Sequence, residues 1–436
     1  MTDPAAVLDE LKARELYFQT TDEAALREHL RRPVVLYNGF DPTADSLTVG
    51  NLVAIMLLRV FARHGHRPIV LMGGATGRIG DPSGKDAERR LLSEEQIAEN
   101  LRGQRPIFER LLGEGVDIVD NDAWFRPMSA YAFLRDVGKH FSVNQMIARD
   151  AVRSRLEREG QGVSYTEFSY MLLQAYDFLY LYRERGVTLQ TAGADQWGNI
   201  VSGVDLIRRL EGPTPAGGPR AFGLTAPLLT RADGGKFGKT EAGAVWLSHA
   251  RPSGAAGTSP YGYYQFWLNT ADADVRRYLL TFTELPVEEI EALSARHAAA
   301  PHDREAQRAL AREATRLLHG DEATRRAEGA ARALFAGDVR DLDAELLAEV
   351  FALAPATDHD RAELGGDGLA LVELLARTTL AKSKSEARTH VQAGAITLNG
   401  ERVTSLEARL TERDLLHGTV ALLRRGKKSW HVTRWR

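Results

Sequence analysis

The 436-residue chain has no cysteine, which excludes disulfide bonds and thiolate metal sites and favours a reducing, cytoplasmic setting. It has no apolar run near the ~18 residues that a membrane helix requires. Its acidic N-terminal segment, MTDPAAVLDE, lacks the apolar core of a secretory signal. The 12 histidines show no HExxH-type spacing, so we expect no metal site. These absences favour a globular protein that works away from membranes.

Two common phosphate-binding motifs are also missing. The glycine-rich segment GGATGRIGDPSG, residues 73–84, does not contain GxGxxG. It is not a Walker A motif either, because Asp86 follows Lys85 and Ile79 stands where that motif has its first glycine. Taken alone, this segment suits a loop with positive φ as well as it suits a phosphate site.

Charge is unevenly distributed along the chain. Residues 369–436 carry 13 Lys and Arg against 6 Asp and Glu, whereas the preceding 368 residues carry 43 against 53. A basic tail on an acidic body is typical of nucleic-acid contact by the tail. A tail that only keeps the chain in solution would give the same totals, so charge alone leaves both interpretations open.

Short apolar runs alternate with amphipathic stretches over the first half of the chain. This alternation predicts an α/β fold with a parallel sheet wound on both faces. In such sheets ligands bind beyond the carboxyl ends of the strands. The strands are expected at residues 34–38, 68–72, 116–119 and 187–191, and the helices at 51–64, from a capping box at Ser93 and Gln96, at 165–185 and at 195–210.

The pattern changes after residue 248. We expect a helical domain over 249–336, an acidic linker over 337–368 and a small α+β domain over 369–436. That last domain should contain a helix over 369–376, the basic turn AKSKSEAR and a second helix ending at Gln392. A hairpin with an Asn399–Gly400 turn should follow.

The segment KFGKT, Lys236 to Thr240, follows Asp-Gly-Gly and therefore lies on a flexible loop. Two lysines three residues apart can close over a polyphosphate and neutralise the charge on a pyrophosphate leaving group. An isolated KxxK is nevertheless more often a solvated basic loop. The segment gains meaning only together with other motifs.

Five motifs occur in order: GFDPTADSLTVGNL, GGATGRIGDPSGK, FSYMLLQAYDF, GADQWGN and KFGKT. In this the chain resembles the bacterial tyrosyl-tRNA synthetases, a family of class I aminoacyl-tRNA synthetases, over nearly its whole length. The resemblance implies a Rossmann-like catalytic domain over 1–248, the helical domain, and an S4-like RNA-binding tail. It also implies that the protein uses ATP with Mg²⁺, without a tightly bound cofactor, to convert L-tyrosine to tyrosyl-adenylate. Tyrosine then passes to the 3′ end of tRNA(Tyr), and the family works as a homodimer whose interface region matches residues 125–165.

The resemblance carries over to individual positions. Phosphate contacts and transition-state stabilisation fall on Thr43, Thr48, Asn51, Lys85, Arg89, Lys236, Lys239 and Thr240. ATP-binding positions are Asp41, Gly50, Asn51, Gly193, Asp195 and Lys239. Tyrosine-binding positions are Tyr37, Asp81, Tyr170, Gln174, Asp177 and Gln196. RNA contacts in the tail are Lys382, Lys384, Arg388, Arg424, Arg425, Lys427 and Lys428.

The implied tyrosine pocket is specific in its chemistry. Tyr37 and Asp177 match the pair that reads the phenol. A site that hydrogen-bonds a substrate hydroxyl rejects the analogue without it by ~10⁴–10⁵-fold, a ratio for which tyrosyl-tRNA synthetases are themselves the standard example. Tyr170, Gln174 and Asp177 are spaced four and three apart, so one helix face presents all three. In isolation such a stripe is more often core or surface.

One motif departs from the family. The usual HIGH tetrapeptide is replaced by Thr48, Val49, Gly50 and Asn51. Gly50 still lets the adenine approach the backbone, and the following helix directs its N-terminal N–H groups toward the nucleotide. We expect the Asn51 amide to replace an imidazole donor well, and the shorter Thr48 hydroxyl to do so partially. Without its neighbours, this stretch would be interpreted as an ordinary strand-to-helix turn.

Two alternative functions remain from the sequence. The chain could be a tryptophanyl-tRNA synthetase, whose catalytic domain is similar; the phenol-reading pair and the S4-like tail oppose this. It could instead be a catalytically weak paralogue that serves as an RNA-binding or splicing factor. Only the altered HIGH motif favours that second alternative.

Overall fold

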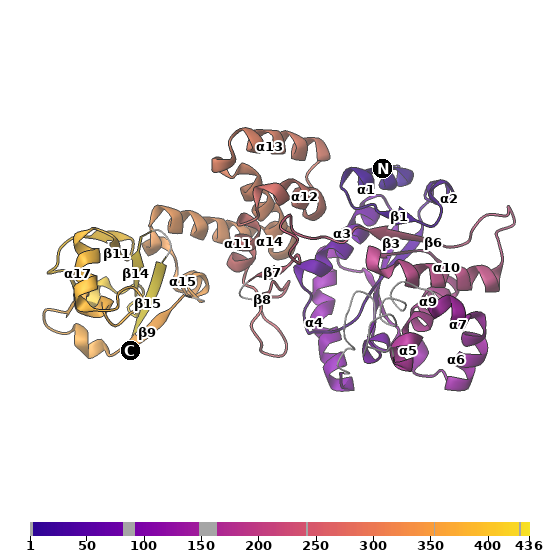
Figure 1. Cartoon of the computed structure of the whole chain (residues 1–436), viewed down its shortest axis with the longest axis horizontal. Helices are drawn as coiled ribbons and strands as arrows, with labels where there is room; N and C mark the ends of the chain where they lie inside the picture. The colour runs from indigo at the N-terminus through magenta and orange to yellow at the C-terminus, as the bar shows by residue number, and fades with distance from the viewer. Residues whose placement is uncertain (1–2, 82–91, 148–163, 241–242, 353, 427–428) are drawn as a thin grey trace. The chain divides into compact units, whose positions relative to one another are not determined.

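The computed structural model describes residues 3–81, 92–147, 164–240, 243–352, 354–426 and 429–436, and its helices and strands are labelled in Figure 1. The chain forms two compact units. The first comprises Met1–Thr258 and Phe266–Leu318, and the second comprises Ser259–Gln265 and His319–Arg436. The division therefore does not follow the expected boundary at residue 248, since residues 249–258 and 266–318 of the expected helical domain belong with the first unit.

The first unit is built on a six-stranded sheet. Its strand order is β1-β6-β5-β2-β3-β4, and every pair is parallel except β1 with β6. This confirms the expected parallel sheet and Rossmann-like class. The strands are β1 Gln19–Thr20, β2 Val35–Phe40, β3 Arg67–Met72, β4 Asp117–Asp120, β5 Val187–Gly193 and β6 Phe222–Ala226.

The helices predicted from the apolar pattern of the first half of the chain are present. α9 ends where Gly186 adopts a left-handed φ of 66°, and the capping box of Ser93 with Gln96 starts α4. The helices are α1 Val7–Ala13, α2 Glu23–His29, α3 Val49–Arg63, α4 Glu94–Leu112, α5 Asp122–Phe125, α6 Ala130–Asp136, α7 Val143–Ile147, α9 Tyr165–Arg185, α10 Trp197–Glu211, α11 Pro260–Leu268, α12 Asp272–Phe282, α13 Val287–Ala299 and α14 Glu305–Ala336. Short 3₁₀ turns include η2 Thr76–Arg78 and η4 Ala194–Gln196. The short strands β7 Lys239–Thr240 and β8 Gly243–Ala244 pair with each other.

One face of the sheet carries an aromatic core. Tyr37, Ile69 and Leu71 alternate with residues that point to the opposite face, and they pack against Ala175 and Phe178 of α9. Tyr37 and Phe178 have ring centroids 5.4 Å apart. This packing places α9 across the sheet, so that its polar residues can reach the carboxyl ends of the strands.

The second unit contains a five-stranded sheet of order β12-β11-β14-β15-β9. Its strands are β9 Ala356–His359, β11 Ile396–Leu398, β12 Glu401–Val403, β14 Val420–Arg425 and β15 Ser429–Trp435, and its helices include α15 Ala344–Val350, α16 Leu371–Leu375 and α17 Lys384–Gln392. The expected hairpin is confirmed, because β11 and β12 pair across Asn399 and Gly400, both with positive φ.

Two expectations for this unit are wrong. Residues 337–368 are not merely a linker, because they contain α15 and β9, and β9 pairs in parallel with β15. Acidic composition gave no sign of this edge strand, whose partner lies far along the chain. The helix expected from residue 369 starts at Leu371, since Leu369 and Ala370 form β10, which pairs with β13, Arg409–Leu410.

Among the described residues no helix is both long and apolar enough to cross a membrane. Those residues also contain no group of three or more His, Asp or Glu placed to hold a metal ion.

Candidate active site

Three strands of the first unit end at the same edge of the sheet. Phe40, Met72 and Asp120 are the last residues of β2, β3 and β4, and they lie in register. The segments that follow these strands therefore meet, as expected for ligand-binding loops of a parallel sheet. The expected tyrosine- and nucleotide-binding residues of the described segments lie on and around this edge.

Asp177 is a buried carboxylate on α9. Its side chain is buried, and its two oxygens accept hydrogen bonds from Trp124 Nε1 at 2.9 Å and Asn121 Nδ2 at 3.1 Å. Burial, and then the charges of Asp41 and Asp120, raise the pKa of Asp177 well above its ordinary value, although both hydrogen bonds oppose the shift. A buried carboxylate with remaining lone pairs can accept a further hydroxyl proton.

Tyr37 faces the same region from β2. Its side chain is 1% exposed, and its hydroxyl has no hydrogen-bond partner among the described residues. Burial, with the charge of Asp177, raises the pKa of Tyr37 well above its ordinary value, so this hydroxyl is neutral. Leaving a buried hydroxyl unpaired costs about 1–3 kcal/mol, and a ligand hydroxyl at this position would remove that cost.

A chain of hydrogen bonds links this pocket to the loop after β2. Asn121 Nδ2 donates to Thr76 Oγ1 at 3.1 Å, and Thr76 Oγ1 donates to Asp41 Oδ1 at 2.8 Å. The Tyr170 hydroxyl donates to Asp41 Oδ2 at 3.0 Å. Asp41 and Asp177 are thus fixed relative to each other through a buried polar network, which positions both carboxylates before any ligand arrives.

The amide of Gln196 lies against Asp81. Gln196 Nε2 donates to Asp81 Oδ2 at 2.6 Å, and its Oε1 accepts from Asn199 Nδ2 at 3.0 Å. Asp81 is buried. Gln174 is half-buried on α9, four residues after Tyr170. Gln196 therefore joins the segment after η2 to the start of α10.

The nucleotide turn, residues 48–51, is more open than the phenol pocket. Thr48 caps α3: its N–H and its hydroxyl both donate to Asn51 Oδ1 at 3.0 Å. Because the Asn51 oxygen is used within this cap, its Nδ2 hydrogens are the group left for a ligand. Gly50 is exposed, and a Cβ built on it would meet only Thr48 Oγ1, at 3.4 Å, within 4 Å.

The lysine loop, Lys236 to Thr240, packs over this turn. A Cβ on Gly238 would lie 2.7 Å from Val49 Cγ2 and 3.4 Å from the Gly50 nitrogen, so the two backbones approach closely. Lys236 is exposed. The structure does not describe the side chains of Lys239 and Thr240, and it does not describe Lys85 or Arg89. KFGKT therefore lies at the start of α3, as its expected role requires.

The ribose-binding candidates flank η4. A Cβ on Gly193 would lie 2.8 Å from Asp195 Oδ1, which explains why glycine precedes this carboxylate. Partial desolvation, followed by the nearby Asp81 carboxylate, raises the pKa of Asp195. Thr43, after β2, is exposed. The structure places each of these expected residues at the edge of the sheet.

The expected RNA-binding residues of the tail do not share one surface. Arg425 Nη1 donates to Leu380 O at 2.8 Å, so this arginine supports the turn between α16 and α17. Arg424 precedes Arg425 in the same strand and therefore points to the opposite face of the sheet. There its guanidinium group lies over the Trp430 ring, 4.8 Å from the ring centroid. The expected contacts on the turn and α17 are exposed at Lys382, Lys384 and Arg388, and Lys427 and Lys428 lie outside the described residues.

Sequence reasoning missed the residues that hold Asp177. Asn121 and Trp124 follow β4 in the segment DNDAW, and Asn121 Oδ1 also accepts the Ala75 N–H at 2.7 Å. Thr76, inside the glycine-rich segment, was missed as well. The available signal was the position of Asn121 at the carboxyl end of a predicted strand.

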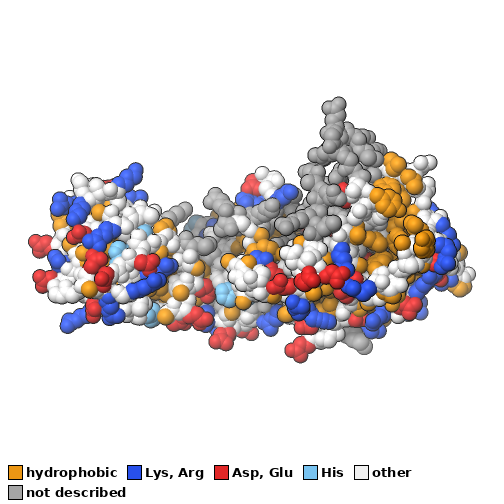
Figure 2. Space-filling view, turned by 90° about the horizontal axis from the view of Figure 1, so that it is seen from below, with side chains coloured by type: hydrophobic (Ala, Val, Ile, Leu, Met, Phe, Trp, Pro, Cys, Tyr) orange, Lys and Arg blue, Asp and Glu red, His pale blue; other side chains and the backbone are white. Residues whose placement is uncertain are grey.

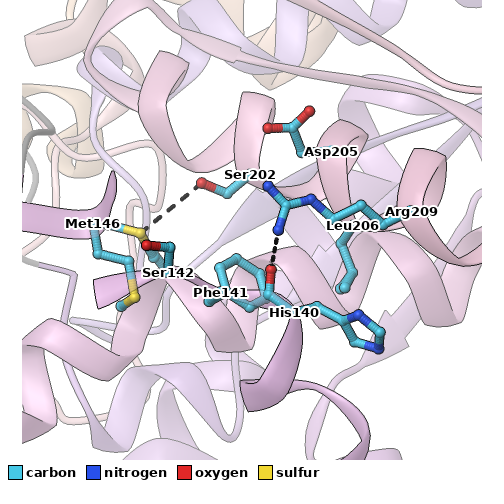
Figure 3. Close-up of a pocket in the computed structure, with 9 residues that line it drawn as sticks. His140, Phe141, Ser142, Met146, Ser202, Asp205, Leu206 and Arg209 are labelled. Carbon is cyan, nitrogen blue, oxygen red and sulfur yellow. Dashed lines mark hydrogen bonds between the residues drawn. The ribbon is translucent and has the colours of Figure 1, made fainter. Parts of the chain in front are cut away.

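A separate cavity lies between α7, α9 and α10 (Figure 3). Its volume is about 20 Å³, which is room for about one water molecule. Arg209 Nη1 donates to the His140 carbonyl at its rim. This cavity is too small for an amino acid or a nucleotide.

Hydrophobic side chains gather on another face of the first unit (Figure 2). The large exposed ones on α6, α7 and the start of α9 are Tyr131, Leu134, Val143, Ile147 and Tyr165. We call these five residues the apolar patch. Apolar groups gathered in this way commonly mark a protein–protein contact.

Comparisons with known proteins agree with this geometry. The family model described as class I tRNA synthetases (W and Y) matches residues 29–336, and the C-terminal domain model of tyrosine–tRNA ligases matches residues 350–433. A tyrosine–tRNA ligase of Geobacillus kaustophilus is 50% identical over 98% of this chain and 99% of its own. One from Roseiflexus castenholzii is 47% identical over the same shares. The solved structure of a C-terminally truncated Aspergillus nidulans mitochondrial tyrosyl-tRNA synthetase is similar, with a TM-score of 0.66 and 30% identity over 76% of this chain and 94% of its own.

Proposed function

The chain belongs to the tyrosyl-tRNA synthetase family of class I tRNA synthetases, and from that premise we propose how its site performs the family's two-step reaction. The reaction uses ATP to activate tyrosine and then transfers the tyrosyl group to tRNA. The observation that carries the proposal is the buried Tyr37 hydroxyl, which has no hydrogen-bond partner in the described part of the chain and feels the charge of the buried Asp177. A substrate phenol would complete the hydrogen bonding of both groups.

Tyrosine recognition follows from this pairing. The phenol donates to Asp177 and accepts from Tyr37, while Asn121 and Trp124 keep the Asp177 carboxylate oriented. A phenylalanine ring would leave the buried Tyr37 hydroxyl without a partner and Asp177 without the additional donor that a phenol supplies, which is the physical basis of its rejection. At the other end, Asp81, Tyr170 and Gln174 surround the α-ammonium group, and Gln196 positions the carboxylate.

Adenylate formation needs no protein base or nucleophile. The tyrosine carboxylate attacks the α-phosphorus of ATP in line, the bond to the β-phosphate oxygen breaks, and pyrophosphate leaves. The protein contributes positioning and charge stabilisation. Mg²⁺ would arrive with ATP as part of that substrate. The phosphate contacts are Thr43, Thr48, Asn51, Lys85, Arg89, Lys236, Lys239 and Thr240.

ATP itself lies along the open part of the edge. Gly50 accommodates the adenine, and Asp195 and Gly193 bind the ribose. Asp41 provides a further contact with the nucleotide. The Asn51 Nδ2 group donates in place of an imidazole. The Thr48 hydroxyl already donates to Asn51, so it can only accept or contribute through a bridging water.

The second unit binds tRNA(Tyr). Lys382, Lys384 and Arg388 lie on the exposed basic turn and α17, where they can meet the RNA backbone. Arg425 supports that turn, and Arg424 with Trp430 offers a cation and a ring on the opposite face. Truncation after residue 336, where the first family match ends, should lower tRNA charging by at least about a hundredfold. Adenylate formation should remain, and equal loss of both activities would contradict this assignment.

The protein functions as a cytoplasmic homodimer through the apolar patch, which lies within the expected interface region of residues 125–165. Burying these side chains against a second copy would remove them from water. Replacing exposed Leu134 and Val143 with glutamate should produce monomers in sedimentation analysis. An unchanged dimer would contradict this interface.

The decisive experiment is tyrosine-dependent exchange of pyrophosphate into ATP. We expect exchange with tyrosine, and none above background with tryptophan. The relatives of 47–50% identity that carry the tyrosine–tRNA ligase name already favour tyrosine over the tryptophan alternative. A purified protein that binds RNA but makes no tyrosyl-adenylate would instead support the RNA-binding paralogue.

A further inference from the structure

An ion pair lies directly before the nucleotide turn. Asp45 is 3% exposed, and Arg251 donates to its Oδ1 through Nε at 2.8 Å and through Nη2. The Ser253 N–H donates to Oδ2 at 2.9 Å. Burial alone would raise the pKa of Asp45, but the hydrogen bonds from Ser253 and Arg251 hold it below its ordinary value. The pair is therefore charged at neutral pH.

Arg251 also stacks on an aromatic ring. Its guanidinium carbon lies 4.0 Å from the centroid of Trp246, and Nη1 donates to Ala256 O at 3.5 Å. The Trp246 N–H donates to Thr258 Oγ1 at 2.9 Å. Only an arginine offers both a planar face for the ring and a fork of donors for the carboxylate.

Trp246 belongs to the stem of the lysine loop, residues 245–247, which runs against the start of α3. Leu247 N donates to Leu47 O at 2.8 Å, and Val49 N donates to Val245 O at 3.0 Å. Trp246 lies opposite Thr48 between these two bonds. The Val245 N–H in turn donates to Gly238 O at 3.1 Å, so the stem continues into the lysine loop.

We propose that Arg251, held between Asp45 and Trp246, is a positioning residue for adenylate formation, because it fixes the stem of the lysine loop against the turn at Thr48. The proposal rests on the proposed function of that loop. The contacts of Arg251 described above are with protein groups, namely Asp45, Trp246 and Ala256. Arg251 determines how closely Gly238 approaches Gly50, and thereby where the loop would meet the phosphates.

The test compares Arg251→Met with Arg251→Lys and Asp45→Asn in the full-length protein. Methionine keeps length and contact with Trp246 but removes the charge, and Asp45→Asn is a milder change in case Arg251→Met does not fold. Arg31→Met is the matched control, because Arg31 is 69% exposed and pairs only with Glu28 among the described residues. The measurements are exchange kcat, KM for ATP, the tyrosine dissociation constant by equilibrium dialysis, and Tm.

We expect Arg251→Met to lower exchange kcat by about tenfold to a hundredfold, with the tyrosine dissociation constant within about twofold of the parent. Arg251→Lys should recover part of kcat, and Arg31→Met should change nothing. Unchanged kcat in Arg251→Met, or in Asp45→Asn if only that variant folds, would overturn the proposal. Parallel loss of tyrosine affinity, kcat and Tm would also overturn it, since that pattern indicates a purely structural pair. Absent exchange in the parent protein would instead contradict the proposed function.

Discussion

The phenol pocket and the nucleotide turn lie at the same edge of one sheet but are built differently. In the pocket, Tyr37 and Asp177 are buried, and Asn121 and Trp124 hold the carboxylate. At the turn, Gly50 is exposed and the polar side chains of residues 48 and 51 bond mainly to each other. The first region is organised before the ligand arrives, whereas the second presents a capped helix start to solvent.

The difference follows from what each region must recognise. A single phenol hydroxyl is distinguished from a hydrogen atom only where unpaired polar groups are costly, which requires burial. Polyphosphate carries several charges that backbone N–H groups and lysine side chains can meet in an open site. We therefore expect burial to supply selectivity in the pocket, and the lysine loop to supply charge at the turn.

Replacing Asp177 with asparagine should produce the largest effect. The variant lacks the charged acceptor, and its NH2 group would face one of the two donors, Asn121 Nδ2 or Trp124 Nε1, while its oxygen could accept from the other. Loss of a buried charged partner costs about 3 kcal/mol, so tyrosine-over-phenylalanine selectivity should fall by roughly a hundredfold. Exchange measured with both amino acids checks this, with exposed Asp9→Asn as control. Retained selectivity would mean that Asp177 does not read the phenol.

Tyr37→Phe should separate stability from recognition within the same pocket. Removing a buried hydroxyl that has no partner among the described residues should leave Tm unchanged or higher. Tyrosine affinity should nevertheless fall by about tenfold, the value of one hydrogen bond of ~1.4 kcal/mol. Thermal melting and exchange kinetics measure the two effects. A clear fall in Tm would show that the hydroxyl is paired in the free protein.

At the turn, Asn51→Ala should lower exchange kcat more than Thr48→Ala does. Asn51 caps the Thr48 N–H and supplies the free amide donors, so its loss should lower exchange kcat by about tenfold. Thr48→Ala should lower kcat by about threefold, because this hydroxyl already donates to Asn51. Thr48→Ser, which keeps the hydroxyl, serves as control. An unchanged rate in Thr48→Ala would mean that Thr48 contributes nothing to catalysis.

The last expected effect concerns stability against pH rather than activity. The pKa of Asp177 is raised in the folded protein above its ordinary 3.8, so the folded state binds this proton more tightly than the unfolded state. Its stability contribution therefore declines as pH rises above 3.8, by at most about 1.4 kcal/mol per pH unit. Thermal melting at a series of pH values from 5 upward should show that the Tm of Asp177→Asn increases relative to the Tm of the parent protein. Parallel curves would mean that Asp177 ionises normally when folded.

Much of the fold could be predicted from local pattern. α9 spans the predicted residues 165–185, because its apolar spacing and the terminal Gly186 act within a few residues. The Asn399–Gly400 hairpin was equally local. The strand β9 was missed because an edge strand in an acidic segment needs a partner to be recognised. Asn121 was missed because its importance lies in a contact with Asp177, which no nearby residue reveals.

The sequence by itself determined the order of the motifs, the family they indicate, and the replacement of both histidines of the HIGH motif. Only the tertiary structure decided which side chains meet: Thr76 and Asn121 between two carboxylates, and Arg251 between Asp45 and Trp246. The physical reason is the separation along the chain between the residues that interact. Periodicity, caps and turns are set by neighbours along the chain, whereas buried polar contacts are set by the packing of segments that are remote in sequence.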